Sequence, residues 1–105
     1  MKLICKSTLL VWFLVGVLSC SDSDQQPDPD FVPKNSKKSF SEDIRPTVFF
    51  DEAHNNLHTS KGKYKPFVQV LTSDGYIVKP SKNKFTLEHL KQADILVIVN
   101  ALGKN

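Results

Sequence analysis

The sequence has 105 residues, of which 40% are apolar and 24% are charged, and this length allows one domain at most. Basic residues exceed acidic ones by a formal charge of +3, and two of the basic residues lie in an N-terminal segment that we expect to be removed. A balance so close to neutral gives no electrostatic case for nucleic-acid binding. Two cysteines are too few for a disulfide framework or a four-cysteine zinc site.

The N-terminal segment has the features of a secretion signal. Lys2 and Lys6 precede an apolar run at residues 9–18, which is too short to span a bilayer as a mature helix. The run ends in Val-Leu-Ser-Cys, which resembles a bacterial lipobox with a larger residue than usual in its second position. This pattern predicts a lipoprotein signal peptide over residues 1–19 and a lipid on Cys20, with the protein in the bacterial cell envelope, at the outer membrane or cell surface. An ordinary secretory signal and an uncleaved short anchor are the alternatives.

Residues 20–43 have the composition of a spacer. The part after Cys20 is acidic and rich in proline, residues 34–41 are polar and basic, and no periodic apolar pattern runs through them. Such a stretch buries too little surface to offset its ordering entropy, so we expect a flexible tether that holds a domain off a membrane. Acidic residues directly after a lipidated cysteine also resemble the surface-export signal of some bacterial lipoproteins.

A first strand and a first helix are predicted near the start of the folded part, residues 44–105. Residues 47–50 form a short β-branched and aromatic run that is typical of a buried strand. Pro66 suits the first turn of the helix that follows, and Gly75 stands where a left-handed C-terminal cap is expected. The helix is predicted from a core-facing apolar stripe, carried by Tyr64, Phe67, Val68 and Leu71.

A second strand, a short second helix and a third strand follow. Residues 76–80 are predicted as a strand ended by proline. Thr86 is predicted to cap a helix over residues 87–92, whose two leucines point inward. The unbroken aliphatic run at residues 95–99 is typical of a central parallel strand that is covered on both faces.

This order of elements predicts an α/β fold. The β-α-β-α-β connectivity is that of the start of a doubly wound, flavodoxin-like parallel sheet. Three strands would leave one sheet edge and one face of residues 95–99 under-covered, so we expect the front part of a longer domain, truncated after the third strand.

The folded part contains several motifs in a characteristic order. These are an acidic, His- and Asn-rich turn at residues 50–59, a Gly-Lys-Tyr-Lys-Pro helix start, an Asp-Gly-Tyr turn, and an Asp-x-Leu-Val-Ile strand at residues 94–98. Together they resemble the opening of an uncharacterised bacterial lipoprotein domain family within the class I glutamine amidotransferase-like superfamily. The resemblance covers residues 47–102 and implies a flavodoxin-like sheet without an established activity.

The same resemblance bears on catalysis. Glutaminases of the superfamily use a cysteine thiolate on a strand–helix elbow, with a distant histidine and acid. The one cysteine expected in the mature chain is Cys20, at the lipid position. We therefore expect no catalytic residue, and a non-catalytic lipoprotein that binds a small polar ligand or a protein partner. The alternative is a truncated hydrolase or amidotransferase-like enzyme whose nucleophile lies beyond Asn105.

Polar residues after the first and third strands should share one crevice if the strand order is 2-1-3. The candidate ligand-binding residues are Asp51, Glu52, His54, Asn55, Asn56 and Asn100. Their carboxylates, imidazole and amides suit a polyol, a peptide or a hydrated ion. His54 could instead orient the turn, the asparagines could serve turn geometry, and Asp51 and Glu52 should point to opposite faces.

Two other groups near this crevice are less informative. His54 and His58 are four residues apart, as metal ligands on a helix often are, but they lack a third certain ligand. We therefore expect neither a metal nor a cofactor. Lys61, Lys63 and Lys65 are expected to form a solvated start of the first helix.

Overall fold

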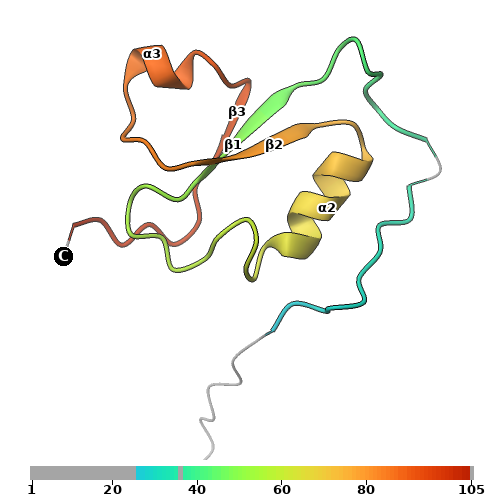
Figure 1. Cartoon of the computed structure of the whole chain (residues 1–105), viewed down its shortest axis with the longest axis horizontal. Helices are drawn as coiled ribbons and strands as arrows, with labels where there is room; N and C mark the ends of the chain where they lie inside the picture. Colours follow the sequence, from blue (N-terminus) through green and yellow to red (C-terminus); the bar gives the residue numbers. More distant parts are fainter. Residues whose placement is uncertain (1–25, 36, 105) are drawn as a thin grey trace, which may run out of the picture.

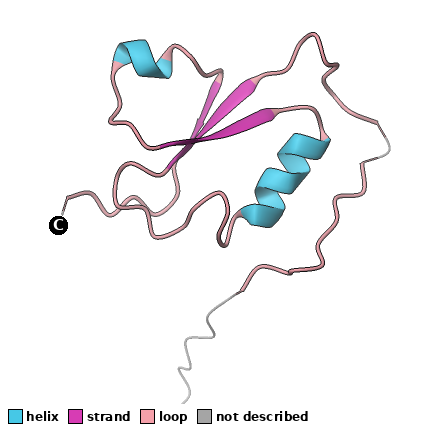
Figure 2. Ribbon diagram, viewed as in Figure 1, coloured by secondary structure: helices cyan, strands magenta, loops and turns pink. Residues whose placement is uncertain are grey.

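The computed structural model describes residues 26–35 and 37–104. The predicted signal peptide, residues 1–19, and the predicted lipid attachment site Cys20 lie outside the described residues. The elements are, in chain order, β1 (Thr47–Asp51), α2 (Lys65–Ser73), β2 (Ile77–Ser81), α3 (Leu87–Leu90) and β3 (Ile95–Val97) (Figure 2). Within the described part, no helix is long and apolar enough to cross a membrane.

The three strands form one open, all-parallel sheet in the order β2-β1-β3 (Figure 1). The central strand β1 places Phe50 opposite Pro80 of β2 on one side and Val97 of β3 on the other. β1 also supplies most of the core, because Val48, Phe49 and Phe50 are all buried. The predicted α/β class, parallel sheet and strand order are therefore confirmed.

The third strand is shorter and less covered than its aliphatic sequence predicts. β3 ends at Val97 rather than Val99 and lies at an edge of the sheet, so the prediction of a central strand is wrong. Ile95 is exposed, and Ile98 is 53% exposed. The burial of a strand depends on neighbouring elements, which a run of apolar residues does not reveal. The partial exposure of residues 95–99 agrees with the expectation that this strand would be under-covered.

Helix α2 begins and ends where its local signals place it. Pro66 occupies the first turn, where its missing amide hydrogen costs no intrahelical bond. At the other end, the amides of Gly75 and Tyr76 donate to the carbonyls of Thr72 and Leu71, which is the Schellman arrangement. Gly75 has a φ of +104°, as that arrangement requires.

The two helices meet opposite faces of the sheet (Figure 1). Successive strand residues point to opposite faces, so the rings of Phe49 and Phe50 mark the two sides. The Phe50 ring contacts Tyr64, at the start of α2, with the ring centroids 5.8 Å apart. The Phe49 ring stacks on His89 of α3 at 4.8 Å. Each helical segment thus contributes one ring contact to β1, Tyr64 to Phe50 and His89 to Phe49.

Neither helix buries its predicted apolar residues fully. No residue of α2 is buried and Phe67 is 42% exposed, so the core-facing stripe is wrong for Phe67. In α3, Thr86 Oγ1 accepts the His89 amide as predicted, but the helix is shorter than residues 87–92. Leu87 is 71% exposed, so its predicted inward orientation is wrong, and His89 takes the place against the sheet.

Part of the predicted tether packs on the folded part. The amide and the hydroxyl of Ser39 both donate to Asp74 Oδ1 at 2.8 Å. The Phe40 ring meets Tyr76 edge-on at a centroid distance of 4.8 Å, and its carbonyl lies against the bare Cα of Gly75. This stretch of the chain is thus fastened to the turn between α2 and β2.

Candidate functional site

The end of β1 carries a buried carboxylate that is held by hydrogen bonds. Asp51 is fully buried. Its Oδ1 accepts from His54 Nδ1 at 2.8 Å and from the Ala53 amide at 3.1 Å, and its Oδ2 accepts from Asn56 Nδ2 at 3.0 Å. Because a carboxylate only accepts, His54 Nδ1 carries the proton of their shared bond. Asp51 therefore holds the turn together through these hydrogen bonds, and it presents no exposed oxygen to a ligand.

These contacts also set the charge of Asp51. Burial favours the neutral acid and raises the pKa of the carboxyl group. The hydrogen bonds from Asn56, His54 and the Ala53 amide, with the nearby His54 charge, outweigh burial and hold the pKa of Asp51 below its usual value. The group is thus ionised at neutral pH, which keeps both side-chain donors oriented toward it.

His54 is held in place on several sides. Besides the bond to Asp51, its amide donates to Asn56 Oδ1 at 3.0 Å and its carbonyl accepts from the Gly103 amide at 3.1 Å. Its ring lies 4.3 Å from the Phe85 ring, centroid to centroid, and 31% of its side chain is exposed. These are the contacts expected if His54 orients the turn.

Glu52 faces away from this cluster. Its Oε1 accepts from the amide and the hydroxyl of Ser60, at 2.9 and 2.6 Å. Asp51 and Glu52 thus have separate partners, as their adjacent positions at the end of a strand predict. The two carboxylates do not form an acid–base pair.

The loops after β1 and β3 lie together, as the strand order predicts. Asn56 Nδ2 donates to the Val99 carbonyl at 3.1 Å, and the Leu57 amide donates to the Asn100 carbonyl at 3.1 Å. Asn56 and Ala101 form an antiparallel bridge. This pairing closes the space in which a crevice between the two loops was expected.

Two of the predicted asparagines serve backbone geometry. Asn55 and Asn100 have φ values of +52° and +42°, a left-handed conformation that asparagine tolerates better than other non-glycine residues. Asn55 also accepts the Leu102 amide through its carbonyl at 3.4 Å. The alternative of turn geometry thus accounts for part of their role.

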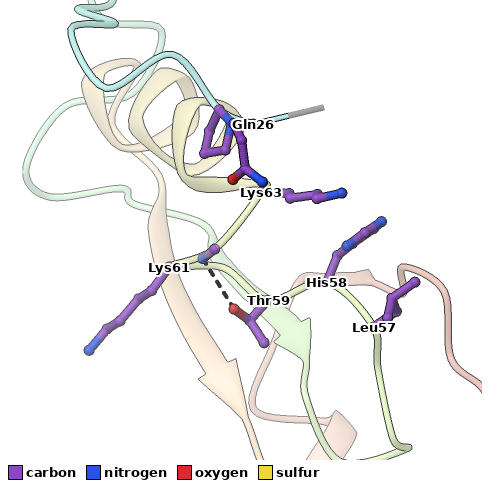
Figure 3. Close-up of a pocket in the computed structure, with 8 residues that line it drawn as sticks. Gln26, Leu57, His58, Thr59, Lys61 and Lys63 are labelled. Atoms are coloured by element: carbon purple, nitrogen blue, oxygen red, sulfur yellow. Dashed lines mark hydrogen bonds between the residues drawn. The ribbon is translucent and has the colours of Figure 1, made fainter. Parts of the chain in front are cut away.

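Two adjoining hollows open beside these loops, with volumes of about 510 and 360 Å³. The larger one is lined by Gln26, Pro27, Leu57, His58, Thr59, Lys61, Gly62 and Lys63 (Figure 3). The smaller one is lined by Gln26, Pro27, His58, Lys63, Tyr64 and Asn100. We refer to the two together as the loop hollow. Asn100 is the predicted site residue that lines it, whereas the other candidate residues are not in its lining, namely Asp51, Glu52, His54, Asn55 and Asn56.

The walls of the loop hollow come from two distant parts of the chain. The loop between β1 and α2 supplies one wall, and it is shaped by Thr59, whose carbonyl and Oγ1 both accept the Gly62 amide at 3.1 Å. Residues 26–27 of the predicted tether supply the other. The side chains of His58 and Lys63 extend to the same side, with Gln26 beside them, and the Lys61 side chain points away (Figure 3).

Sequence reasoning missed most of this hollow. The sequence predicts Lys63 in a solvated helix start and indicates for His58 no role other than a metal ligand. The signal that was available is the Lys-Gly-Lys-Tyr stretch directly before a helix, with the glycine between two cations. The contribution of Gln26 has no local signal, because it depends on where the tether runs. Within the described residues, no three side chains of His, Cys, Asp or Glu gather as metal ligands.

Comparison of the chain with protein-family models, with curated proteins and with solved structures finds no match.

Proposed function

We propose that this protein is a lipid-anchored, non-catalytic binding module that holds a small polar ligand in the loop hollow. The anchor would be the lipid on Cys20, which places the module in the bacterial cell envelope with the membrane as its partner. The folded part would be the beginning of a doubly wound, flavodoxin-like domain of the amidotransferase-like type, in line with the sequence motifs described above.

The observation that carries the binding function is the position of the loop hollow. In open α/β sheets, ligands bind outside the carboxyl ends of the strands, at the point where the strand order reverses. Here that point lies between β1 and β3, and Asn100, which follows β3, lines the hollow beside His58 and Lys63. A volume of about 360 Å³ for the smaller hollow falls in the range of small-molecule sites, roughly 300–1,000 Å³.

Binding without catalysis fits the state of the buried polar groups. Asp51 and Glu52 are both committed to internal hydrogen bonds. His58 and Asn100, which line the hollow, have side chains that can form hydrogen bonds to a ligand.

A ligand screen on the isotope-labelled full chain in neutral detergent micelles tests the binding function. Polyols, dipeptides and hydroxy acids are titrated while amide chemical shifts are followed by NMR. We expect a binding member to shift the amides of His58, Lys63 and Asn100 together, and Asn100→Ala to weaken it. Asn83→Ala, on an exposed loop, is the matched control. Shifts confined to other regions would contradict the proposal.

Metabolic labelling with palmitate tests the anchor. Cys20→Ala should abolish incorporation of the label, and Cys5→Ala should leave it unchanged because Cys5 would be discarded with the signal peptide. Retention of the label in Cys20→Ala would refute the lipoprotein assignment.

A second candidate function, an amidotransferase-like hydrolase, is favoured by the Asp51–His54 pair. A buried carboxylate that fixes an imidazole is the arrangement that supports a general base. Among the described residues, the neighbouring hydroxyl of Ser81 is buried and hydrogen-bonded to His89 Nε2 at 2.8 Å, so it is not presented to a substrate. Release of ammonia from glutamine by the full chain, abolished in His54→Ala, would favour this function over simple binding.

A further inference from the structure

We propose that residues 26–35 and 37–40 of the predicted tether form a strap that closes one side of the loop hollow and is held in place at the far end of α2. This inference rests on the proposed function, because it concerns the control of access to the same hollow.

The strap runs alongside α2, from the start of the helix to its end (Figure 1). At the start, Gln26 and Pro27 line the hollow together with Tyr64, the N-cap residue of the helix. At the end, Asn35 Nδ2 donates to Ser73 Oγ at 2.9 Å. Because α2 has nine residues, these two places are about 13 Å apart along the helix axis.

The end of α2 holds the strap through several contacts. Besides the bond from Asn35, the amide and the hydroxyl of Ser39 both donate to Asp74 Oδ1 at 2.8 Å. The Phe40 amide donates to the Asp74 carbonyl at 3.2 Å, and the Phe40 ring packs edge-on against Tyr76. Hydrogen bonds to a charged acceptor are stronger than neutral ones. We refer to these contacts of Asn35, Ser39 and Phe40 as the clasp.

The part of the strap between the clasp and the hollow is only partly buried. Pro27, Phe31 and Pro33 are half-buried, whereas Val32 is 71% exposed. Such limited burial offsets only part of the conformational entropy that is lost when a chain segment is ordered. The position of the strap at the hollow therefore depends on the clasp.

Chain length gives the size of this dependence. Asn35 is nine residues from Gln26, whereas the next fixed points, Phe40 and Arg45, are 14 and 19 residues from it. Arg45 is fixed because its guanidinium donates to two carbonyls of the turn after α2. The effective concentration of a tethered group falls roughly as the −3/2 power of the linker length. Moving the fixed point from Asn35 to Phe40 should thus lower the occupancy of the hollow by the strap about twofold, and moving it to Arg45 about threefold.

Two clasp variants of the full chain test this inference. Asn35→Ala/Asp74→Ala removes the hydrogen bonds to the Ser73 hydroxyl and the Asp74 carboxylate. Addition of Phe40→Ala gives a triple variant that also lacks the ring contact with Tyr76. The matched control is a triple variant at neighbouring exposed positions, Lys34→Ala/Asp43→Ala/Thr72→Ala.

Three NMR readouts on the isotope-labelled chain in neutral detergent micelles separate the strap from the fold. Nuclear Overhauser cross-peaks between residues 26–27 and 58–63 report the closed hollow, hydrogen exchange of the Ser39 amide reports the clasp, and exchange of the Leu57 amide reports the paired loops. We expect the cross-peaks to weaken about twofold in the double variant and about threefold in the triple variant. The Ser39 amide should exchange about 10-fold faster in both, and the Leu57 amide should stay slow. The control should behave as the parent chain.

The outcomes separate the strap from the binding function. Cross-peaks of unchanged intensity in both clasp variants, with fast exchange at Ser39, would overturn the strap, as would fast exchange of that amide in the parent chain. Should the triple variant also lose slow exchange at Leu57, the milder double variant decides. Because these readouts need no ligand, a failed screen with polyols, dipeptides and hydroxy acids would overturn the binding function without touching this result.

Discussion

Replacement of Asp51 by asparagine tests the hydrogen bonds that hold the turn after β1. The shape of the side chain is kept, but its charge is removed and one acceptor becomes a donor. The new amide oxygen can still accept from His54 and Ala53, whereas its NH₂ group faces Asn56 Nδ2, which is also a donor. The variant therefore loses one hydrogen bond to a charged group and weakens two more.

The magnitude follows from these contacts. A hydrogen bond to a charged group contributes about 1.5–3 kcal/mol. Two features reduce the loss, because Asn56 Nδ2 keeps its second bond to the Val99 carbonyl and because the variant no longer buries a charge. We expect Asp51→Asn to lower the free energy of unfolding by about 2 kcal/mol, a large part of the roughly 5–15 kcal/mol typical of a domain.

Urea denaturation of the full chain, followed by far-UV circular dichroism, measures this change. The exposed variant Asp43→Asn is the matched control and should stay within about 0.5 kcal/mol of the parent chain. An Asp51→Asn variant that is equally close to the parent chain, or more stable than it, would refute the assignment of Asp51 as the organiser of the turn.

Three further predictions concern pH, the turn after α2 and the start of α3. Because the pKa of Asp51 is lowered in the folded state, its contribution to stability is present above the usual aspartate pKa of about 4 and is lost as the pH falls toward the lower folded value. In urea titrations at several pH values, the free energy of unfolding of Asp51→Asn should therefore fall less steeply below pH ~4 than that of the parent chain. An equally steep fall would contradict this. Gly75→Ala should cost about 2 kcal/mol, because a Cβ there would overlap the Phe40 carbonyl oxygen and the φ of +104° disfavours a side chain. Gly103→Ala, with a φ of +78° and no atom near the new Cβ, should cost less, and equal thermal melting points for the two variants would exclude the Phe40 contact. Thr86→Ala should cost about 1 kcal/mol through loss of the bond from the His89 amide, which a thermal melt against Thr72→Ala checks.

Local signals predicted the elements of the fold with few errors. The proline at the start of α2, Gly75 at its end and the Thr86 cap all act through bonds to neighbours in the sequence, so their positions can be read from the sequence itself. The strand order 2-1-3 was expected from the flavodoxin-like connectivity, because the right-handedness of each crossover does not by itself fix the side on which the third strand lies. What failed was coverage, because Leu87 and Ile98 are exposed by the absence of nearby atoms from other described elements, which no local pattern encodes.

In the candidate site, too, some features could be predicted from the sequence and others depend on contacts between distant segments. Strand order was sufficient to predict that Asn56 and Asn100 come from neighbouring loops. It was not sufficient to predict that the loops pair with each other through the bond from the Leu57 amide to the Asn100 carbonyl, which closes the expected crevice. The open space lies instead beside the loop between β1 and α2, where Gln26 of the predicted tether also lines it. A contact between residues so distant in the sequence has no signature in either segment.

The pairing of the loops after β1 and β3 is the structural basis of the proposed binding function, and nuclear Overhauser effects on the isotope-labelled full chain measure it directly. We expect cross-peaks between Asn56 and Ala101, together with slow hydrogen exchange of the Leu57 amide, which donates to the Asn100 carbonyl. Fast exchange of that amide and cross-peaks that place residues 55–57 away from residues 100–102 would contradict the account.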